Sequence, residues 1–196
     1  MNAPMSTQQR NRNRGMLVLI VVFFLGSAAV AGALRLSGWR PEGTRNHGEL
    51  LQPPGDLRDV AARLLDGGDY PWRPAERTWR IALAPGADCG APCVQLSQQL
   101  DTVWRLFGHR ADHVHILWIG EAPSEAVRNP AWRELAPDPA LVDALPRNDD
   151  PAGTPVFVID PNGFVIDPNG FVILRYPPGF DPGHLREDVA RLLKLR

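Results

Sequence analysis

The sequence predicts an α/β domain with a central mixed sheet flanked by helices, preceded by one membrane-spanning helix. Three observations predict it: an uncharged apolar stretch near the N-terminus, a strand–helix–strand order in mid-chain, and a β-hairpin followed by a closing helix. The 20 prolines among 196 residues favour a small ordered core with long loops over a helical bundle. A formal net charge of −1, with no basic run beyond the apolar stretch, gives no sign of a nucleic-acid partner.

The apolar stretch is Gly15–Leu34, which contains no charged residue. As a helix, its twenty residues cover about 30 Å, the thickness of a bilayer's hydrocarbon core. Arg10, Arg12 and Arg14 precede it, which favours an N-terminus inside the cell and the remainder outside. A cleaved signal peptide is the alternative, because Ala29-Val30-Ala31 is typical of a cleavage site. Since the apolar stretch continues beyond that site, we favour an uncleaved anchor.

The chain is therefore expected to divide into four parts. Residues 1–14 form a cytoplasmic tail and residues 15–34 the transmembrane anchor. Residues 35–56, rich in proline, glycine and charge, form a linker. Residues 57–196 form the folded domain, which is long enough to bury a proper core.

The elements of this domain follow from apolar runs and their periodicity. Short apolar or β-branched runs predict strands, and apolar positions at helical spacing predict helices. In order, we expect a strand at Trp79–Ala84, a helix at Pro92–Phe107, a strand at His113–Ile119, a short helix around Ala131–Leu135, strands at Pro155–Ile159 and Phe171–Tyr176, and a helix at Leu185–Leu195.

Asp149 and Asp150 lie in a proline-rich loop, and we expect both carboxylates to be solvated.

The two cysteines of the chain, Cys89 and Cys93, lie where the first strand gives way to the first helix. Positions i and i+4 of a helix share one face with Cα atoms about 6 Å apart, within the range of a disulfide. A helix N-terminus stabilises a thiolate and lowers the pKa of the nearer sulfur. Cys89 should be the more exposed and reactive, because it precedes the helix. The pair can form a disulfide or hold a thiophilic metal.

This order of elements resembles the thioredoxin fold, with Gly153-Thr154-Pro155 similar to its cis-proline strand. Three residues separate the cysteines, as in the copper-handling Sco (SenC) proteins, and two further stretches are similar to those proteins, Asn46–Leu51 and Arg175-Tyr176-Pro177. The resemblance implies a thioredoxin-like protein of the bacterial inner membrane, with its domain in the periplasm, that assists assembly of the copper centre of cytochrome c oxidase. Cys89 and Cys93 would bind copper or reduce client cysteines, and Thr154 and Pro155 would shape a substrate groove.

One departure concerns the metal. Sco proteins hold copper with both cysteines and a distal histidine just before the hairpin, but the corresponding stretch here, Arg147–Pro155, has none. Two thiolates suffice for copper(I), whereas copper(II) prefers an added imidazole. His47, in the segment that resembles the family, is the candidate third ligand if the linker folds back.

Three classes of function remain open. The first is the oxidase assembly factor, whose partner is a cytochrome c oxidase subunit or another copper or thiol client. The second is a general periplasmic thiol–disulfide oxidoreductase, and the third is a non-catalytic scaffold with a structural disulfide. We favour the first.

The hairpin contains a tandem repeat, with Phe157–Gly163 recurring unchanged as Phe164–Gly170. Lengthening a loop costs roughly 0.6 kcal/mol per doubling, whereas displacing the closing helix exposes several apolar side chains at about 1.5–3 kcal/mol each. We therefore expect Val156–Ile159 to pair with Phe171–Tyr176 as they would without the insert. Residues 160–170 should then protrude, leaving Phe164–Ile166 less buried than Phe157 or Phe171.

Overall fold

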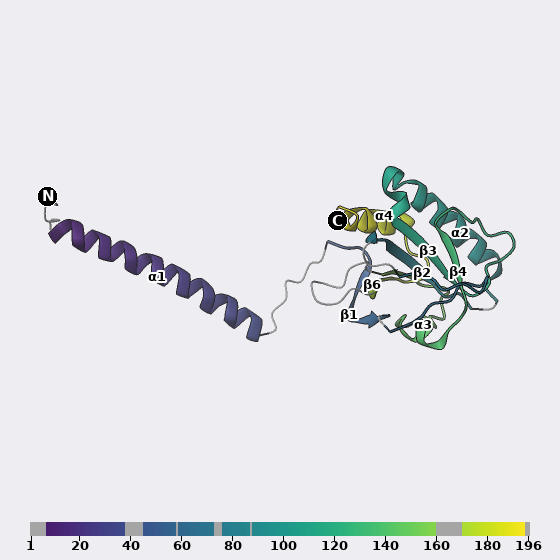
Figure 1. The fold of residues 1–196 in the computed structure, drawn as a ribbon, viewed down its shortest axis with the longest axis horizontal. Coiled ribbons are helices and arrows are strands. Elements are labelled where there is room, and N and C mark those ends of the chain that lie inside the picture. The colour runs from purple at the N-terminus through teal and green to yellow at the C-terminus, as the bar shows by residue number, and fades with distance from the viewer. Residues whose placement is uncertain are drawn as a thin grey trace. The chain divides into compact units, whose positions relative to one another are not determined.

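A computed structural model describes residues 7–37, 45–57, 59–72, 76–86, 88–159 and 170–194. The chain divides into two units, residues 1–45 and 46–196. The first contains helix α1 (Thr7–Leu36), in which Asn11–Leu36 is long and apolar enough to cross a membrane, with a mean hydropathy of 2.7 and every residue exposed (Figure 1). The apolar helix expected at residues 15–34 is therefore present.

The second unit is built on one six-stranded sheet with the order β1-β6-β5-β2-β3-β4. Strands β2, β3 and β4 run parallel to one another, and the remaining pairs are antiparallel. The strands are β1 (Glu49–Asp56), β2 (Trp79–Leu83), β3 (Val114–Ile119), β4 (Trp132–Leu135), β5 (Val156–Ile159) and β6 (Phe171–Tyr176). This is the mixed sheet that the sequence predicts.

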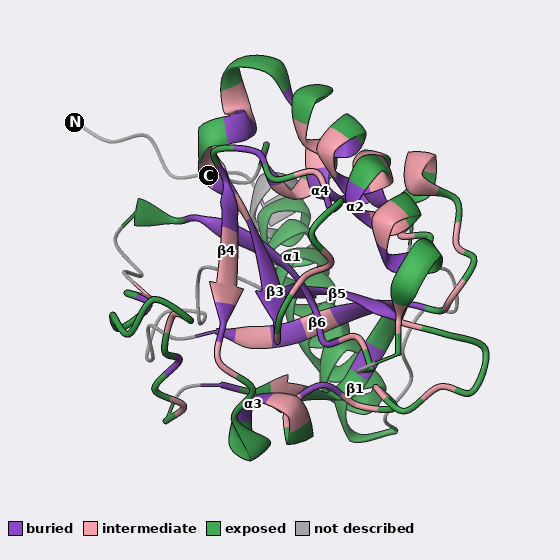
Figure 2. Cartoon of the chain, turned by 90° about the vertical axis from the view of Figure 1, so that its right-hand side faces the viewer, coloured by how far each residue is buried: buried purple, intermediate pink, exposed green. Residues whose placement is uncertain are grey.

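Side chains of β2 alternate between two apolar layers, as a pleated strand requires. Ile81 and Leu83 pack in the layer that contains buried residues of α2 (Gly90–Arg105) and α4 (Pro182–Leu192). Ala82 packs in the opposite layer, which includes residues of the short helix α3 (Pro139–Asp143) and of the 57–72 segment. Figure 2 shows buried strands between these two coverings, with α2 and α4 on one side and α3 on the other. A 3-10 helix, η2 (Gly108–His113), connects α2 to β3.

Strand β1 differs from the sequence expectation, which places residues 49–56 in the linker. It pairs antiparallel with β6, from Glu49 opposite Arg175 to Asp56 opposite Phe171, with an irregularity between Leu50 and Gly55. Two prolines lie within that irregular stretch, and an edge strand tolerates proline since only one of its sides is paired. The compact unit therefore begins at Asn46.

Strand β4 is the second difference, because the sequence predicts a short helix around Ala131–Leu135. Trp132 stacks on Trp118 with ring centroids 5.0 Å apart, and Leu135 is fully buried in the opposite layer. Apolar side chains three residues apart fit a helical turn as well as a short strand, and pairing with β3 decides for the strand.

The hairpin strands pair as predicted, with Val156 opposite Tyr176 and Val158 opposite Leu174. Phe157 is fully buried and Phe171 is half-buried. The repeated segment, including Phe164–Ile166, lies outside the described residues, so its protrusion stays a prediction.

Candidate functional site

The two cysteines form a disulfide at the N-terminus of α2, with an S–S distance of 2.03 Å and Cα atoms 5.4 Å apart. Cys89 is the residue that immediately precedes the helix, and Cys93 lies in its first turns. Cys93 is fully buried against the sheet, whereas Cys89 is half-buried. Of the two states that the sequence left open, the structure shows the disulfide, and the greater exposure of Cys89 is confirmed.

The chain places the disulfide where a thiolate is stabilised after reduction. Strand β2 ends at Leu83, and α2 begins at Gly90. The positive end of the helix dipole therefore lies beside Cys89, and no side chain caps this helix terminus. Cys93, Ser97 and Leu100 follow at helical spacing and anchor that face of α2 in the core.

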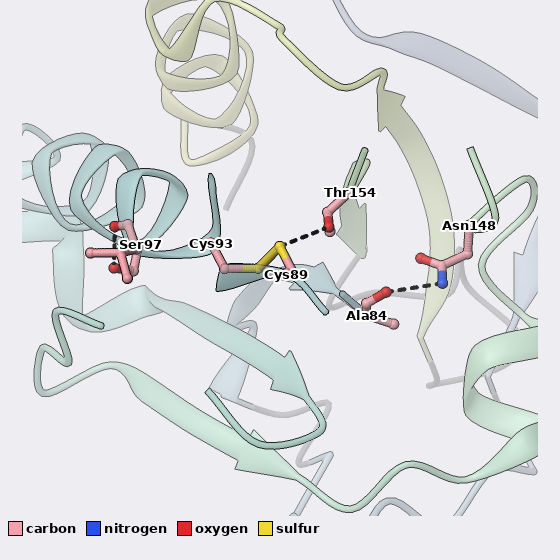
Figure 3. Close-up of a disulfide and its surroundings, with 7 residues drawn as sticks. Ala84, Cys89, Cys93, Ser97, Asn148 and Thr154 are labelled. Carbon is pink, nitrogen blue, oxygen red and sulfur yellow. Dashed lines mark hydrogen bonds between the residues drawn. A yellow bond between two sulfur atoms is a disulfide. The ribbon is translucent and has the colours of Figure 1, made fainter. Parts of the chain in front are cut away.

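Thr154 contacts the sulfur of Cys89, with its Oγ1 3.6 Å from Cys89 Sγ (Figure 3). A hydroxyl at this distance makes a weak hydrogen bond to sulfur and can donate to a thiolate. Thr154 also lines a groove that opens beside Cys89, while Pro155 is buried and is not among its lining residues.

The peptide bond before Pro155 is trans, which corrects the expected cis-proline. In the described part of the chain, the one cis bond lies between Gln52 and Pro53. Trans is the ordinary isomer of an X–Pro bond, and the short resemblance around residue 155 did not determine the isomer.

The groove beside Cys89 has a volume of about 800 Å³. Three segments line it: the region from residue 84 to the first turns of α2, the loop 148–154, and the turn 178–180. The first and second segments are joined by Asn148, whose side-chain Nδ2 donates to the carbonyl of Ala84 at 3.0 Å (Figure 3). The disulfide therefore lies in a wall of a formed groove.

Arg175 anchors the 148–154 loop through hydrogen bonds. It is buried in β6 and donates to Asp150 Oδ2 at 2.6 Å and to the carbonyl of Arg147 at 3.2 Å. The Ala152 N–H and then the Arg175 guanidinium hold the pKa of the Asp150 carboxyl below its ordinary value. Asp150 is thus a structural partner, not the solvated loop residue that the sequence suggested. Only the fold could reveal this, because 25 residues separate the pair.

His47 lies against α4, where its ring stacks on that of His184 with centroids 4.1 Å apart and its Nδ1 is 3.2 Å from Asp188 Oδ1. Among the residues that the structure describes, no group of three or more His, Cys, Asp or Glu side chains is arranged to hold a metal ion. The structure therefore does not bring His47 to Cys89 and Cys93. The segment that contains His47 packs on the closing helix and not beside the cysteines.

Asp188 is the centre of this second polar cluster, which sequence reasoning missed. Its carboxylate accepts the N–H groups of His47 at 2.6 Å and Gly48 at 3.0 Å, the Tyr176 hydroxyl at 2.8 Å, and Arg191 at 3.0 Å. Burial alone raises the pKa of Asp188, but the hydrogen bonds from Gly48, Tyr176 and His47 lower it below its ordinary value. Burial and the bond to Asp188 raise the pKa of Tyr176. A Cβ at Gly48 would lie 2.6 Å from the Tyr176 ring, so this approach requires glycine.

Comparison with known proteins supports the fold. Residues 79–196 match the family model described as transmembrane-like, thioredoxin-like, C-terminal domain. No curated protein sequence matches the chain.

Solved structures with the same fold include Sco proteins. One is BsSco, a member of the Sco family of cytochrome c oxidase assembly proteins in which a disulfide switch is identified. It is 12% identical to this chain with a TM-score of 0.51, and the match covers 76% of this chain and 98% of BsSco. Yeast Sco1 with copper bound is 13% identical with a TM-score of 0.51, over 79% and 96%. Peroxiredoxin Q of Xanthomonas campestris is 17% identical with a TM-score of 0.44, over 76% and 97%. At these identities the likeness to BsSco and Sco1 shows a shared thioredoxin-like fold.

Proposed function

This chain belongs to the family of transmembrane-like, thioredoxin-like C-terminal domains, and from that membership we propose that it is a membrane-tethered thiol–disulfide protein acting through Cys89 and Cys93. One observation carries the proposal. The half-buried sulfur of Cys89 lines a groove, and it is joined to a fully buried sulfur four residues later. A disulfide that only stapled the fold would have no need of a groove on one sulfur.

The exchange proceeds in two steps. In the reduced protein, the Cys89 thiolate attacks a client disulfide, forming a mixed disulfide and releasing one client thiolate, which takes up a proton. Cys93 then loses its proton and attacks Cys89, which forms the Cys89–Cys93 disulfide and releases the second client thiolate. Two electrons and two protons pass to the client, and a dithiol reductant outside this chain restores the pair.

Each neighbouring group has a role in this scheme. The N-terminus of α2 stabilises the Cys89 thiolate, and the Thr154 hydroxyl donates to it. Thr154 and the rest of the 148–154 loop bound the space that the client occupies, with Pro155 buried behind them. Burial of Cys93 keeps the resolving thiol away from other oxidants.

The proposed location is the bacterial inner membrane, with residues 1–14 in the cytoplasm, residues 15–34 as the anchor, residues 35–45 as the linker, and the domain in the periplasm. The apolar α1 and the basic residues before it support this topology. A C-terminal alkaline phosphatase fusion should be active, and an inactive one beside a fluorescent cytoplasmic reporter would overturn the topology.

The proposed client is the copper-centre subunit of cytochrome c oxidase, or another protein whose cysteines must be reduced before metal insertion. The shared fold with BsSco and Sco1 supports this choice. Copper would fit the site as cargo in its copper(I) state. The reduced pair offers two soft thiolates, which suit copper(I), and the described residues supply no third ligand for copper(II).

Redox titration tests the proposal. The full chain is equilibrated in thiol–disulfide buffers, trapped by alkylation and weighed by mass spectrometry. We expect a reversible two-electron transition at a potential above about −300 mV, whereas a lower potential would indicate a purely structural disulfide.

A second measurement addresses copper. Reduced protein should bind one copper(I), and Cys89→Ser or Cys93→Ser should abolish binding. If reduced wild-type protein binds none while the redox transition persists, copper carriage is excluded and thiol exchange remains.

A further inference from the structure

We infer that the groove beside Cys89 selects clients by charge, accepting an extended polypeptide segment whose cysteine has basic neighbours and disfavouring one with acidic neighbours. The inference rests on the proposed thiol–disulfide exchange and adds to it the class of client.

The groove is shaped for a chain segment that lies alongside the sulfur. Half of the residues that line its loop and turn walls are small or rigid: Pro151, Ala152, Gly153, Pro178 and Gly179. The two walls meet where the Pro178 side chain lies 3.4 Å from the place that a Cβ on Gly153 would occupy. At these five positions no long side chain stands between the wall and a backbone segment lying against it.

The charges that line the groove are all negative. They belong to Asp88, Asp149 and Asp150, and no lysine, arginine or histidine is among the lining residues. The lining comes from residues that the structure describes, and it brings Asp88 close to a loop some 60 positions later in the chain.

Two arginines contact the 148–154 loop or lie just before it, and each is paired with a carboxylate of the protein. Arg175 is buried and pairs with Asp150 at 2.6 Å, so it offsets that carboxylate inside the protein. Arg147 pairs with Glu49 at 2.6 Å. Asp88 and Asp149 are exposed, and their carboxylates can interact with charges on a ligand bound in the groove.

The effect on rate should be moderate and sensitive to salt. An exposed ion pair typically changes an equilibrium by about 1.7- to threefold, so two carboxylates acting on a client with two basic neighbours give about a three- to tenfold preference. Since the Debye length falls from about 30 Å at 0.01 M salt to about 3 Å at 1 M, the preference should shrink over this range. Apolar contacts along the walls would not show this dependence.

The test uses two synthetic peptides that differ only in the residues beside one cysteine, lysine on both sides in one and glutamate in the other. The cysteine is activated as a neutral 2-thiopyridyl disulfide. The reduced full chain attacks the peptide sulfur, expels 2-thiopyridone, which absorbs light, and then releases the peptide as Cys93 closes the disulfide. The second-order rate of the first step is measured.

We expect the lysine peptide to react about three- to tenfold faster at low salt, and the two rates to converge at 1 M salt. Asp88→Asn and Asp149→Asn, singly and together, should reduce the preference. Asp112→Asn, which removes an exposed carboxylate beyond the far end of α2, is the matched control and should leave it unchanged.

Equal rates for the two peptides at low salt would overturn the charge preference and leave the exchange reaction standing. A preference that is unchanged in Asp88→Asn, in Asp149→Asn and in the double variant would also overturn it. No reaction with either peptide would overturn both the proposed exchange and the inference drawn from it.

Discussion

The clusters around Asp188 and around Cys89 are both built at helices that pack on the same face of the sheet, yet they use polar groups in opposite ways. Asp188 is 2% exposed, and its carboxylate accepts hydrogen bonds from four residues. Cys89 is half-buried, lines a groove, and has one long contact with Thr154. Since a buried polar group is costly when a partner is removed, a saturated cluster fixes structure, and an unsaturated one at a groove is available for chemistry.

The largest effect should come from the saturated cluster. Asp188→Ala leaves two backbone N–H groups and the Tyr176 hydroxyl without their acceptor, and we expect a loss of about 3 kcal/mol in the free energy of unfolding. Urea denaturation measures it. Glu187→Ala is the control, because its exposed pair with Arg191 should contribute less than about 0.5 kcal/mol. Equal losses for the two variants would refute the contrast.

The disulfide should contribute less, despite being covalent. Its short loop, with a sequence separation of four, restricts the unfolded chain little, and the chain-entropy model gives about 2 kcal/mol. Unfolding of the Cys89→Ser/Cys93→Ser double variant against the oxidised protein measures this. Loss of folding in the double variant would show that the pair is chiefly a structural staple.

Acid should destabilise the domain through a third group, His115. Burial, then Arg133 and Arg80, lower the pKa of His115 to about 4, and Tyr70 contacts its Nδ1 at 2.8 Å. The unfolded chain takes up this proton near pH 6.5 and the folded protein only near pH 4. Stability is therefore fully present above pH 6.5 and falls as the pH drops toward 4.

The expected loss is on the order of 1 kcal/mol, less than the full shift implies because the ring is partly exposed to water. Unfolding at pH 7 and pH 4.5 measures it. His115→Gln should flatten this part of the profile, whereas His109→Gln, at an exposed position, should not. Identical profiles for wild type and His115→Gln would contradict the assignment.

The smallest effect should come from the unsaturated site. Thr154→Val keeps the shape but removes the hydroxyl beside Cys89, which should slow alkylation of Cys89 in the reduced protein by about two- to threefold at neutral pH without changing stability. Thr102→Val, on the exposed side of α2, should change neither. A large loss of stability in Thr154→Val would mean that the contact between Thr154 and Cys89 stabilises the fold, as the hydrogen bonds around Asp188 do.

Sequence reasoning found the parts of this contrast that depend on local pattern. Apolar alternation and helical spacing predicted β2, α2, β3 and the hairpin pairing, and the position of Cys89 before a helix predicted its exposure. It missed the pairs that only the fold brings together, such as Asp150 with Arg175 and Asp188 with His47, because residues 25 and 141 positions apart carry no shared local signal. Prolines likewise concealed β1, since at a sheet edge they are compatible with a strand.

The two edges of the sheet limit how another polypeptide can join it. Along β4, the N–H of Leu65 donates to Glu134 O and the N–H of Ala136 donates to Arg63 O, so residues 63–65 already occupy that edge. At the other edge, Pro53 and Pro54 in β1 have no N–H to offer. Neither edge presents the continuous row of donors and acceptors that β-augmentation needs. Neighbouring copies of this domain are therefore protected from edge-to-edge aggregation.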